Sequence, residues 1–211
     1  MPILFITAVQ REASAIRSIL DADDCLIVSG IGRTNAAAAT TEAILQHGPF
    51  ELAVSSGIAG ALPGSNLSIG DIIAATACVY AEEGIISPEG FGDVTVLGFP
   101  LGNFAGNSVP CSAAHVALLP SDIARGRIAT VATCSGTDDA AEIVSARTGA
   151  VAEAMEGAAV VHAALRLHVP GLEIRAISNT TGDRDRQTWD IEKALKSLGL
   201  NMSSIRRALR K

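Results

Sequence analysis

The segment PILFITA, residues 2–8, decides the fold class of this chain of 211 residues. It is apolar throughout and has the length of a strand, and a strand without polar alternation is typical of a sheet that is covered on both faces. Similar short runs recur along the chain, and they predict further strands at residues 25–29, 51–56, 72–79, 127–133, 151–155 and 172–178.

Helical patterns separate these strands. Apolar spacing, together with glycine and proline at the ends, predicts helices over residues 10–20, 35–46, 137–147, 157–168 and 190–209. Residues 84–110 are rich in Gly, Pro and Asn, and we expect functional loops there with one short strand at residues 94–97. The alternation predicts a single α/β domain over residues 1–211, in which helices flank a central, mostly parallel or mixed twisted sheet.

Composition excludes several classes of function. The chain has 22 acidic and 16 basic residues and a net charge of -6, which excludes a sequence-independent nucleic-acid binder, whose affinity depends on Lys and Arg. Aromatic residues make up 3%, too few for a platform that stacks single-stranded bases. The cysteines form no CxxC pair, which argues against a zinc site or a redox dithiol, and we expect no metal and no cofactor. These cysteines are Cys25, Cys78, Cys111 and Cys134.

The histidines, Cys134 and two uncharged or apolar segments are given no catalytic or membrane role. Cys134 is expected to be a small core residue, and the scattered His47, His115, His162 and His168 are expected to be structural. Residues 94–121 lack charge but contain three prolines, so they are not a membrane span. The first residues lack the basic start of a signal peptide, and a cytoplasmic protein without a membrane partner is expected.

Four strand ends draw attention because ligands of such folds bind beyond the carboxyl ends of strands. They are residues 8–12, 55–60, 154–156 and 178–179. The second of them ends in GIAG, residues 57–60, which we expect to be a loop that turns the chain from a strand toward a helix. Its backbone N–H groups would also suit a ligand, although the segment matches neither a Walker A loop nor a GxGxxG fingerprint.

Each of three polar side chains at these ends has a structural and a functional interpretation. Glu12 suits either the first turn of a helix, where it complements the helix dipole, or a catalytic role. Glu156 lies among apolar residues and is either a helix cap or a carboxylate that accepts hydrogen bonds from two hydroxyls of a sugar. Asn179 is a turn residue, a helix cap, or an amide that donates to and accepts from the N7 and O6 edge of a 6-oxopurine.

Six segments in this order resemble the purine nucleoside phosphorylase/nucleosidase superfamily, and within it the methylthioadenosine/S-adenosylhomocysteine nucleosidases. The resemblance implies that Glu12 activates water, that Glu156 holds the ribose hydroxyls and that Met155 packs against the ribose. We expect Ile58, Ala59 and Gly60 to line the substrate. The six segments are ITAVQREA (6–13), VSGIGRTNAA (28–37), SSGIAGAL (55–62), IGDII (69–73), AMEGAA (154–159) and RAISN (175–179).

The chain departs from those nucleosidases at Asn179, where they have an aspartate. An amide cannot deliver a proton to N7, which puts adenine substrates in doubt and fits hypoxanthine or guanine. Residues 152–157 (AEAMEG) and 182–199 are similar to the futalosine hydrolases, which remove hypoxanthine from futalosine in menaquinone biosynthesis. A methylthioadenosine/S-adenosylhomocysteine nucleosidase, an inosine/guanosine phosphorylase and a non-catalytic nucleoside-binding protein stay open as alternatives.

The choice between water and phosphate as the acceptor depends on charge. No arginine lies within residues 55–62, although Arg11 and Arg33 lie near two other strand ends. The carboxylate of Glu12 would repel phosphate and favours water.

The 5′ substituent of futalosine is an aromatic ketone with a carboxylate, so its site should be apolar with a cationic end. Phe91, Phe99, Phe104 and Trp189 are apolar candidates, and Arg184 or Arg186 would meet the carboxylate unless GDRDR (182–186) is a solvated loop with internal salt bridges. The resemblance also implies a homo-oligomer, at least a dimer.

Overall fold

The computed structural model describes residues 2–210. Its strands are β1 (Ile3–Thr7), β2 (Cys25–Val28), β3 (Leu52–Ala61), β4 (Ile72–Tyr80), β5 (Gly84–Ser87), β6 (Gly90–Asp93), β7 (Ser108–Pro110), β8 (Ala124–Thr130), β9 (Ala152–Ala154) and β10 (Gly171–Thr180). Its helices are α1 (Gln10–Ile16), η1 (Arg17–Ile19), α2 (Arg33–His47), α3 (Val94–Leu97), α4 (Ala113–Leu118), α5 (Asp138–Thr148), α6 (Gly157–Arg166), η2 (Arg184–Arg186) and α7 (Ile191–Ala208).

One mixed sheet holds the fold together. Its strand order is β10-β4-β8-β9-β3-β1-β2, β7 pairs with β4, and a further pairing of β10 with β3 closes five of the strands into a ring. The strands β1, β2, β3 and β10 run parallel, whereas β4 is antiparallel to β10 and β9 is antiparallel to β3. The predicted α/β fold with a mixed sheet is confirmed.

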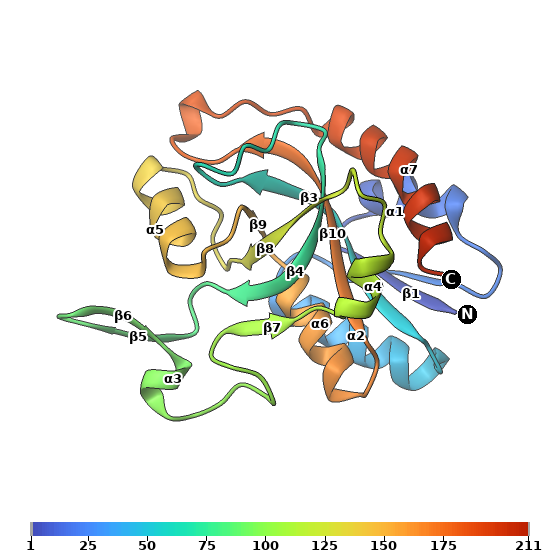
Figure 1. Cartoon of the computed structure of the whole chain (residues 1–211), viewed down its shortest axis with the longest axis horizontal. Helices are drawn as coiled ribbons and strands as arrows, with labels where there is room; N and C mark the ends of the chain where they lie inside the picture. The colour runs from blue at the N-terminus through green and yellow to red at the C-terminus, as the bar shows by residue number, and fades with distance from the viewer. Residues whose placement is uncertain (1, 211) are drawn as a thin grey trace.

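Two pairs of helices flank the sheet. α1 packs against α7, and α2 packs against α6, so that the pairs lie above and below the strands in the view of Figure 1. α7 comes so close to α1 that a Cβ at Gly199 would lie 2.6 Å from the carbonyl oxygen of Ala15, which explains a glycine within this long helix. Burial of Ile3, Leu4 and Phe5 in β1 confirms the sheet core expected from PILFITA.

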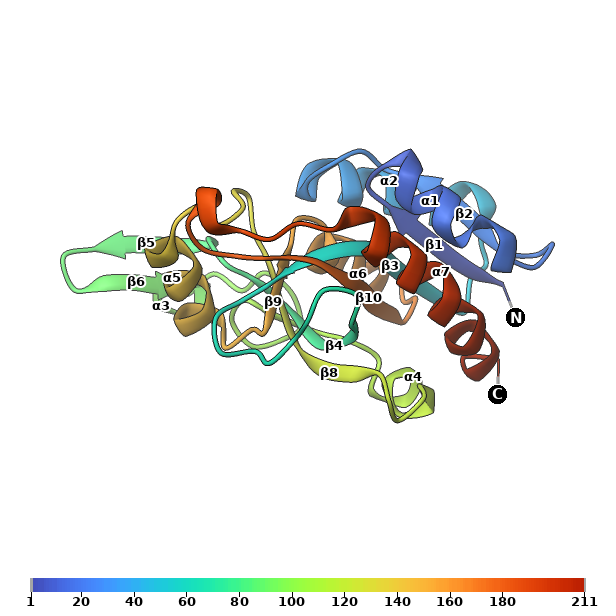
Figure 2. The same cartoon turned by 90° about the horizontal axis from the view of Figure 1, so that it is seen from above.

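Two expectations about the segment 84–110 are wrong. Residues 94–97 are the short helix α3 and not a strand, because Asp93 caps its first turn by accepting from the N–H of Thr95, and Gly98 ends it in the left-handed conformation. Residues 84–93 form the hairpin of β5 and β6, which projects at the end of the molecule opposite both chain termini (Figures 1 and 2). The sequence interpretation also missed α4.

The segment GIAG is also placed differently from our expectation. Residues 57–60 continue β3, because β10 runs beside them in parallel from Gly57–Arg175 to Gly60–Asn179. The expected loop is therefore a strand, and the ligand-facing groups belong to the sheet itself. Within residues 2–210, no helix is long and apolar enough to cross a membrane.

Candidate active site

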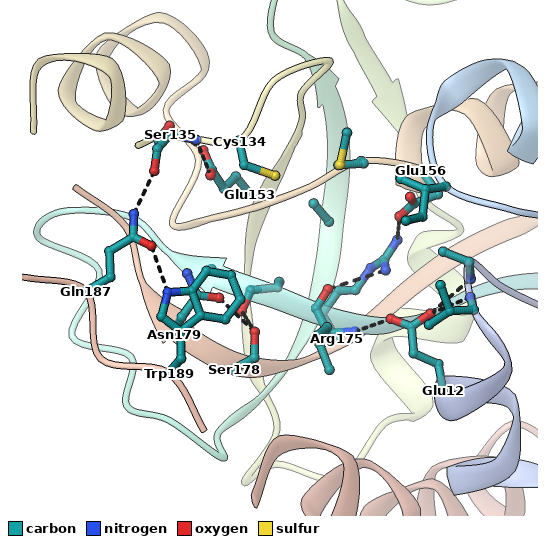
Figure 3. Close-up of a pocket in the computed structure, with 18 of the residues that line it drawn as sticks. Glu12, Cys134, Ser135, Glu153, Glu156, Arg175, Ser178, Asn179, Gln187 and Trp189 are labelled. Carbon is teal, nitrogen blue, oxygen red and sulfur yellow. Dashed lines mark hydrogen bonds and ion pairs between the residues drawn. The ribbon is translucent and has the colours of Figure 1, made fainter. Parts of the chain in front are cut away.

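The candidate site forms where β3 changes its neighbour. One edge of β3 pairs with β1 up to Ser55 and then with β9 from Gly60, whereas the other edge follows β10 along its whole length. Between Ser55 and Gly60, no described strand pairs with the first edge, so backbone groups there are free to meet side chains. The first turn of α1, which follows β1, and the turn between β9 and α6 converge on this gap and bring Glu12 and Glu156 to it (Figure 3).

A cavity of about 550 Å³ opens at this gap. Its volume suits a ligand of nucleoside size. All the residues predicted to act in catalysis or to bind the ribose and the base line it, namely Glu12, Ile58, Ala59, Gly60, Met155, Glu156 and Asn179. The structure therefore brings the four predicted strand ends into one site.

Glu12 is fixed by the backbone on both of its oxygens. Oε2 accepts from the N–H groups of Ala8 (2.9 Å) and Val9 (3.2 Å), and Oε1 accepts from the N–H of Ile58 (2.9 Å), which lies in the gap of β3. A Cβ at Gly57 would collide with this carboxylate, so glycine is required there. Since a carboxylate offers about four acceptor positions, three filled positions leave about one for a ligand.

Glu156 has more free capacity than Glu12. It lies at the N-cap position of α6 without capping it through its side chain, and its Oε1 accepts from the N–H of Gly32 (3.0 Å). Its Oε2 forms an ion pair with Arg175 (3.3 Å). About two acceptor positions stay open, which is the number that the two hydroxyls of a ribose diol need.

Arg175 is a site residue that the sequence interpretation missed. It is 1% exposed, and its guanidinium donates to Glu173 (2.8 Å), Ser55 Oγ (3.0 Å) and Glu156. Burial by itself lowers the pKa of Arg175, but the charges of Glu173, Glu156 and Glu12 outweigh it and raise that pKa. A charge within the apolar motif RAISN was the signal, because a buried arginine needs partners.

Asn179 lies at a bulge of β10, where the register with β3 shifts between Ile177 and Asn179. Its Oδ1 accepts from the hydroxyl of Ser178 (2.7 Å), and its Nδ2 donates to the carbonyl of Thr180 (2.9 Å). These partners fix which end of the amide is oxygen. One N–H and one lone pair stay available, so the amide can still donate and accept once.

The side chains of Gln187 and Trp189 line the cavity beside Asn179 and are held by hydrogen bonds. Gln187 donates to the carbonyl of Ser135 (2.9 Å) and accepts from the indole N–H of Trp189 (2.8 Å). The guanidinium of Arg184 lies 4.6 Å from the centre of the Trp189 ring. Figure 3 shows Gln187, Trp189 and Asn179 together, away from Glu12 and Arg175.

Glu153 is a second carboxylate that the sequence interpretation missed. It lines the cavity from β9, and its two oxygens accept from the N–H (2.8 Å) and the hydroxyl (2.6 Å) of Ser135. Burial raises the pKa of Glu153, while the two bonds from Ser135 act in the opposite direction. It is 5% exposed and therefore a buried acidic group. Since Ser135 fills one acceptor position on each oxygen, about two positions stay open.

Other predicted candidates lie outside the cavity. Of the apolar and cationic candidates for a 5′ substituent, only Trp189 and Arg184 line it, at the Asn179 end. Arg186 forms exposed ion pairs with Asp138 and Asp183, as the salt-bridged loop interpretation of GDRDR expects. Phe91 and Phe104 line a different cavity, and Phe99 is exposed.

The interpretation of Cys134 as a core residue is wrong. Cys134 is exposed and lines the cavity, because it follows β8 in the segment that leads to α5. None of the four histidines lines this cavity. Within residues 2–210, no cluster of His, Cys, Asp and Glu is arranged to hold a metal ion.

The arginines considered for phosphate are engaged elsewhere. Arg11 is exposed and pairs with Glu192 of α7, and Arg33 pairs with Glu82 (3.3 Å) and Glu83 (2.6 Å). Neither lines the cavity.

Comparisons with known proteins show which family this chain is similar to. Residues 10–211 match the model of the phosphorylase superfamily. A futalosine hydrolase of Streptomyces coelicolor is 36% identical over 197 residues, which cover 91% of this chain and 82% of the relative. A futalosine hydrolase of Acidothermus cellulolyticus is 38% identical over an alignment that covers 92% of this chain and 86% of the relative.

A solved structure has the same fold. A mutant of the futalosine hydrolase of Helicobacter pylori superposes with a TM-score of 0.79 at 20% identity, covering 98% of this chain and 99% of the other. The sequence matches and the shared fold confirm the predicted relationship. This chain belongs to the phosphorylase superfamily and, within it, to the futalosine hydrolase family.

Proposed function

We propose that this protein hydrolyses the N-glycosidic bond of futalosine and releases hypoxanthine. One observation carries the proposal: Glu12, Glu156 and Asn179 line a single cavity, with carboxylates at one end and a neutral amide at the other. The identity of 36–38% to two futalosine hydrolases over most of the chain supports the same substrate.

The carboxylate end holds the ribose and the water. Glu156 accepts hydrogen bonds from the 2′- and 3′-hydroxyls through its two open positions, and Met155 packs against the sugar. As the bond to the base breaks, positive charge develops on the ribose, and the buried carboxylates stabilise it. Glu12 uses its single open position to orient one water molecule and to take a proton from it as the water oxygen attacks C1′.

The amide end holds the base. The free N–H of Asn179 donates to the 6-oxygen, and its Oδ1 accepts from N7 once a proton arrives there from solvent. The base leaves with the electron pair of the broken bond, so a donor at O6 stabilises the negative charge that it gains. The backbone of Ile58, Ala59 and Gly60 forms the floor under the sugar and the base.

Charge at the site favours water over phosphate. Arg175, the buried cation of the cavity lining, is already engaged by Glu173 and Glu156. A phosphate would have to approach Glu12 and Glu156 with no free cation of residues 2–210 beside them, and charges of one sign repel strongly in a buried site. Arg184 lies at the opposite end, beside Trp189.

We also propose a homo-oligomer of at least two subunits that acts in the cytoplasm in menaquinone biosynthesis. Ile31 is 57% exposed at the cavity rim, and Ile86 on the projecting hairpin is 82% exposed, so both would gain from a covering subunit. Light scattering should give at least twice the mass of one chain; a fully active monomer at the assay concentration would contradict this part of the proposal.

The function is tested with futalosine, inosine and methylthioadenosine, each with and without phosphate, and the released base and sugar are identified. We expect hypoxanthine from futalosine at a rate that phosphate does not change. Formation of ribose 1-phosphate from inosine would identify a phosphorylase, preferred release of adenine would identify a methylthioadenosine nucleosidase, and binding without any release of base would identify a non-catalytic binding protein.

A further inference from the structure

Glu153 is the carboxylate of the cavity that the proposed reaction does not use. In the sheet it pairs with Gly60 of β3, and Gly60 pairs on its other side with Asn179 of β10. All three residues line the same cavity. Glu153 and Asn179 therefore reach this cavity from the two strands on either side of a glycine.

The glycine between them leaves an open strip. Neighbouring strands lie about 4.8 Å apart, so the backbones at Glu153 and Asn179 are separated by roughly 10 Å. A Cβ at Gly60 would lie 3.0 Å from Nδ2 of Asn179 and 2.8 Å from Thr181 Cγ2, so a side chain there would crowd the amide. The strip is wide enough to receive the edge of a flat purine between an acid and an amide.

The hydrogen bonds of Glu153 leave it able to accept. The N–H and the hydroxyl of Ser135 fill one position on each oxygen, and about two positions stay open. An ionised carboxylate only accepts hydrogen bonds, so it selects a ligand atom that carries a proton. In a 6-oxopurine the atoms N1–H, O6 and N7 follow one another along one edge, and N1 is the donor among them.

We propose that Glu153 is a specificity-determining residue that accepts a hydrogen bond from N1–H of the 6-oxopurine, while Asn179 contacts the N7 side and O6 lies over Gly60. This inference rests on the proposed function and adds a second base contact to it. Adenine carries a lone pair at N1 and no proton, so it would face the carboxylate with two acceptors opposed. The site thereby rejects 6-aminopurines at two places.

The test compares hypoxanthine with 1-methylhypoxanthine, which lacks the N1 proton, by calorimetric binding to the whole protein. The natural protein should bind hypoxanthine roughly 10- to 100-fold more tightly, as expected for a hydrogen bond to a charged group. In Glu153→Ala, which also removes the bulk that a methyl group would meet, the two affinities should agree within about threefold. Glu153→Gln, which keeps the size of the side chain, should also reduce the ratio.

Ser135→Ala serves as the matched control, because it removes the hydroxyl partner of Glu153 but leaves the carboxylate in the cavity. It should retain a preference of more than tenfold for hypoxanthine. If Glu153 only holds Ser135 in place, Glu153→Ala will weaken both bases by the same factor and keep their ratio, and this result would overturn the proposal. Equal binding of both bases by the natural protein would overturn it as well.

Turnover separates this inference from the proposed function. If futalosine yields hypoxanthine but Glu153→Ala keeps the ratio of affinities, the function stands and the role of Glu153 is wrong. If the natural protein neither cleaves futalosine nor binds hypoxanthine, the proposed function fails, and the base contact fails with it. Thermal melting of each variant confirms that the compared proteins are folded.

Discussion

The two ends of the cavity are built in different ways. At the carboxylate end, Glu12 is held by three backbone N–H groups, and Glu156 is held by one N–H and by the buried Arg175. At the amide end, Asn179 accepts from the hydroxyl of Ser178 and donates to the carbonyl of Thr180, and the neighbouring Trp189 is 42% exposed. The end with the buried carboxylates suits bond cleavage, and the end beside the exposed Trp189 suits the choice of base.

The largest effect is expected from removing the group that we assign to water activation. Glu12→Gln keeps the size of the side chain but removes the charge that accepts a proton. We expect kcat for futalosine to fall by about 10²- to 10⁴-fold, the usual cost of losing a positioned base. Steady-state kinetics on the purified variant measures it. Glu42→Gln, on an exposed turn of α2, is the matched control and should leave kcat unchanged.

A second prediction concerns the buried charges of the same end. Arg175→Met leaves Glu173 and Glu156 without their cation, and breaking such a buried pair costs about 3–5 kcal/mol. Urea unfolding should show a loss of this size in the free energy of unfolding at neutral pH. The loss should shrink as the pH is lowered, because burial raises the pKa of Glu173 and a protonated Glu173 no longer needs the cation.

The exposed ion pair provides the contrast for Arg175. Arg186→Ala removes contacts with Asp138 and Asp183 at the surface, where solvent screens ion pairs and they contribute little to stability. Equal losses of stability in Arg175→Met and Arg186→Ala would show that the buried ion pairs of the carboxylate end contribute no more to the free energy of unfolding than the exposed ones.

The third prediction alters the choice of base. Asn179→Asp replaces the neutral amide by an acid, which would oppose the acceptors of a 6-oxopurine and, when protonated, suit a 6-aminopurine. We expect kcat/KM for futalosine to fall by roughly 10- to 100-fold, and activity on methylthioadenosine to rise relative to it. Competition kinetics with both substrates gives the ratio directly, and an unchanged ratio would contradict the base-reading role of Asn179.

The smallest effect is expected at the rim of the amide end. Arg184→Ala removes a cation from the face of Trp189, a contact that contributes about 0.5–1 kcal/mol at exposed positions. We expect KM for futalosine to rise a few-fold, whereas Arg186→Ala, outside the cavity, should leave it unchanged. If both variants keep the natural KM, residues 182–186 form only a solvated loop.

The carboxylate end was more accessible to sequence analysis than the amide end. Glu12 follows a long apolar strand and Glu156 stands alone among small residues, so both charges were conspicuous. Asn179 was also found at a strand end, but only the resemblance showed that it replaces an aspartate. All three line the cavity, and their catalytic and binding roles stay predictions.

Some of the missed features depend on pairing between distant segments, and others depend on local contacts. GIAG carries the glycines of a turn, yet it is a strand because β10 pairs with it, and only the closed ring of strands shows that Glu153 and Asn179 flank Gly60. Arg175 was read only as part of the motif RAISN and not as a site residue, although its partner Glu173 lies two residues before it. Residues 94–97 have strand-forming side chains, but the cap at Asp93 and Gly98 forces a helical turn.

The most direct measurement of the central claim is a competition in water enriched in ¹⁸O between futalosine and its 6-amino counterpart. If water is activated at Glu12 and a 6-oxopurine is selected at Asn179, the label will appear on C1′ of the released sugar, and hypoxanthine will form in large excess over adenine. Release of adenine at an equal or greater rate, or a sugar without the label, would contradict the account.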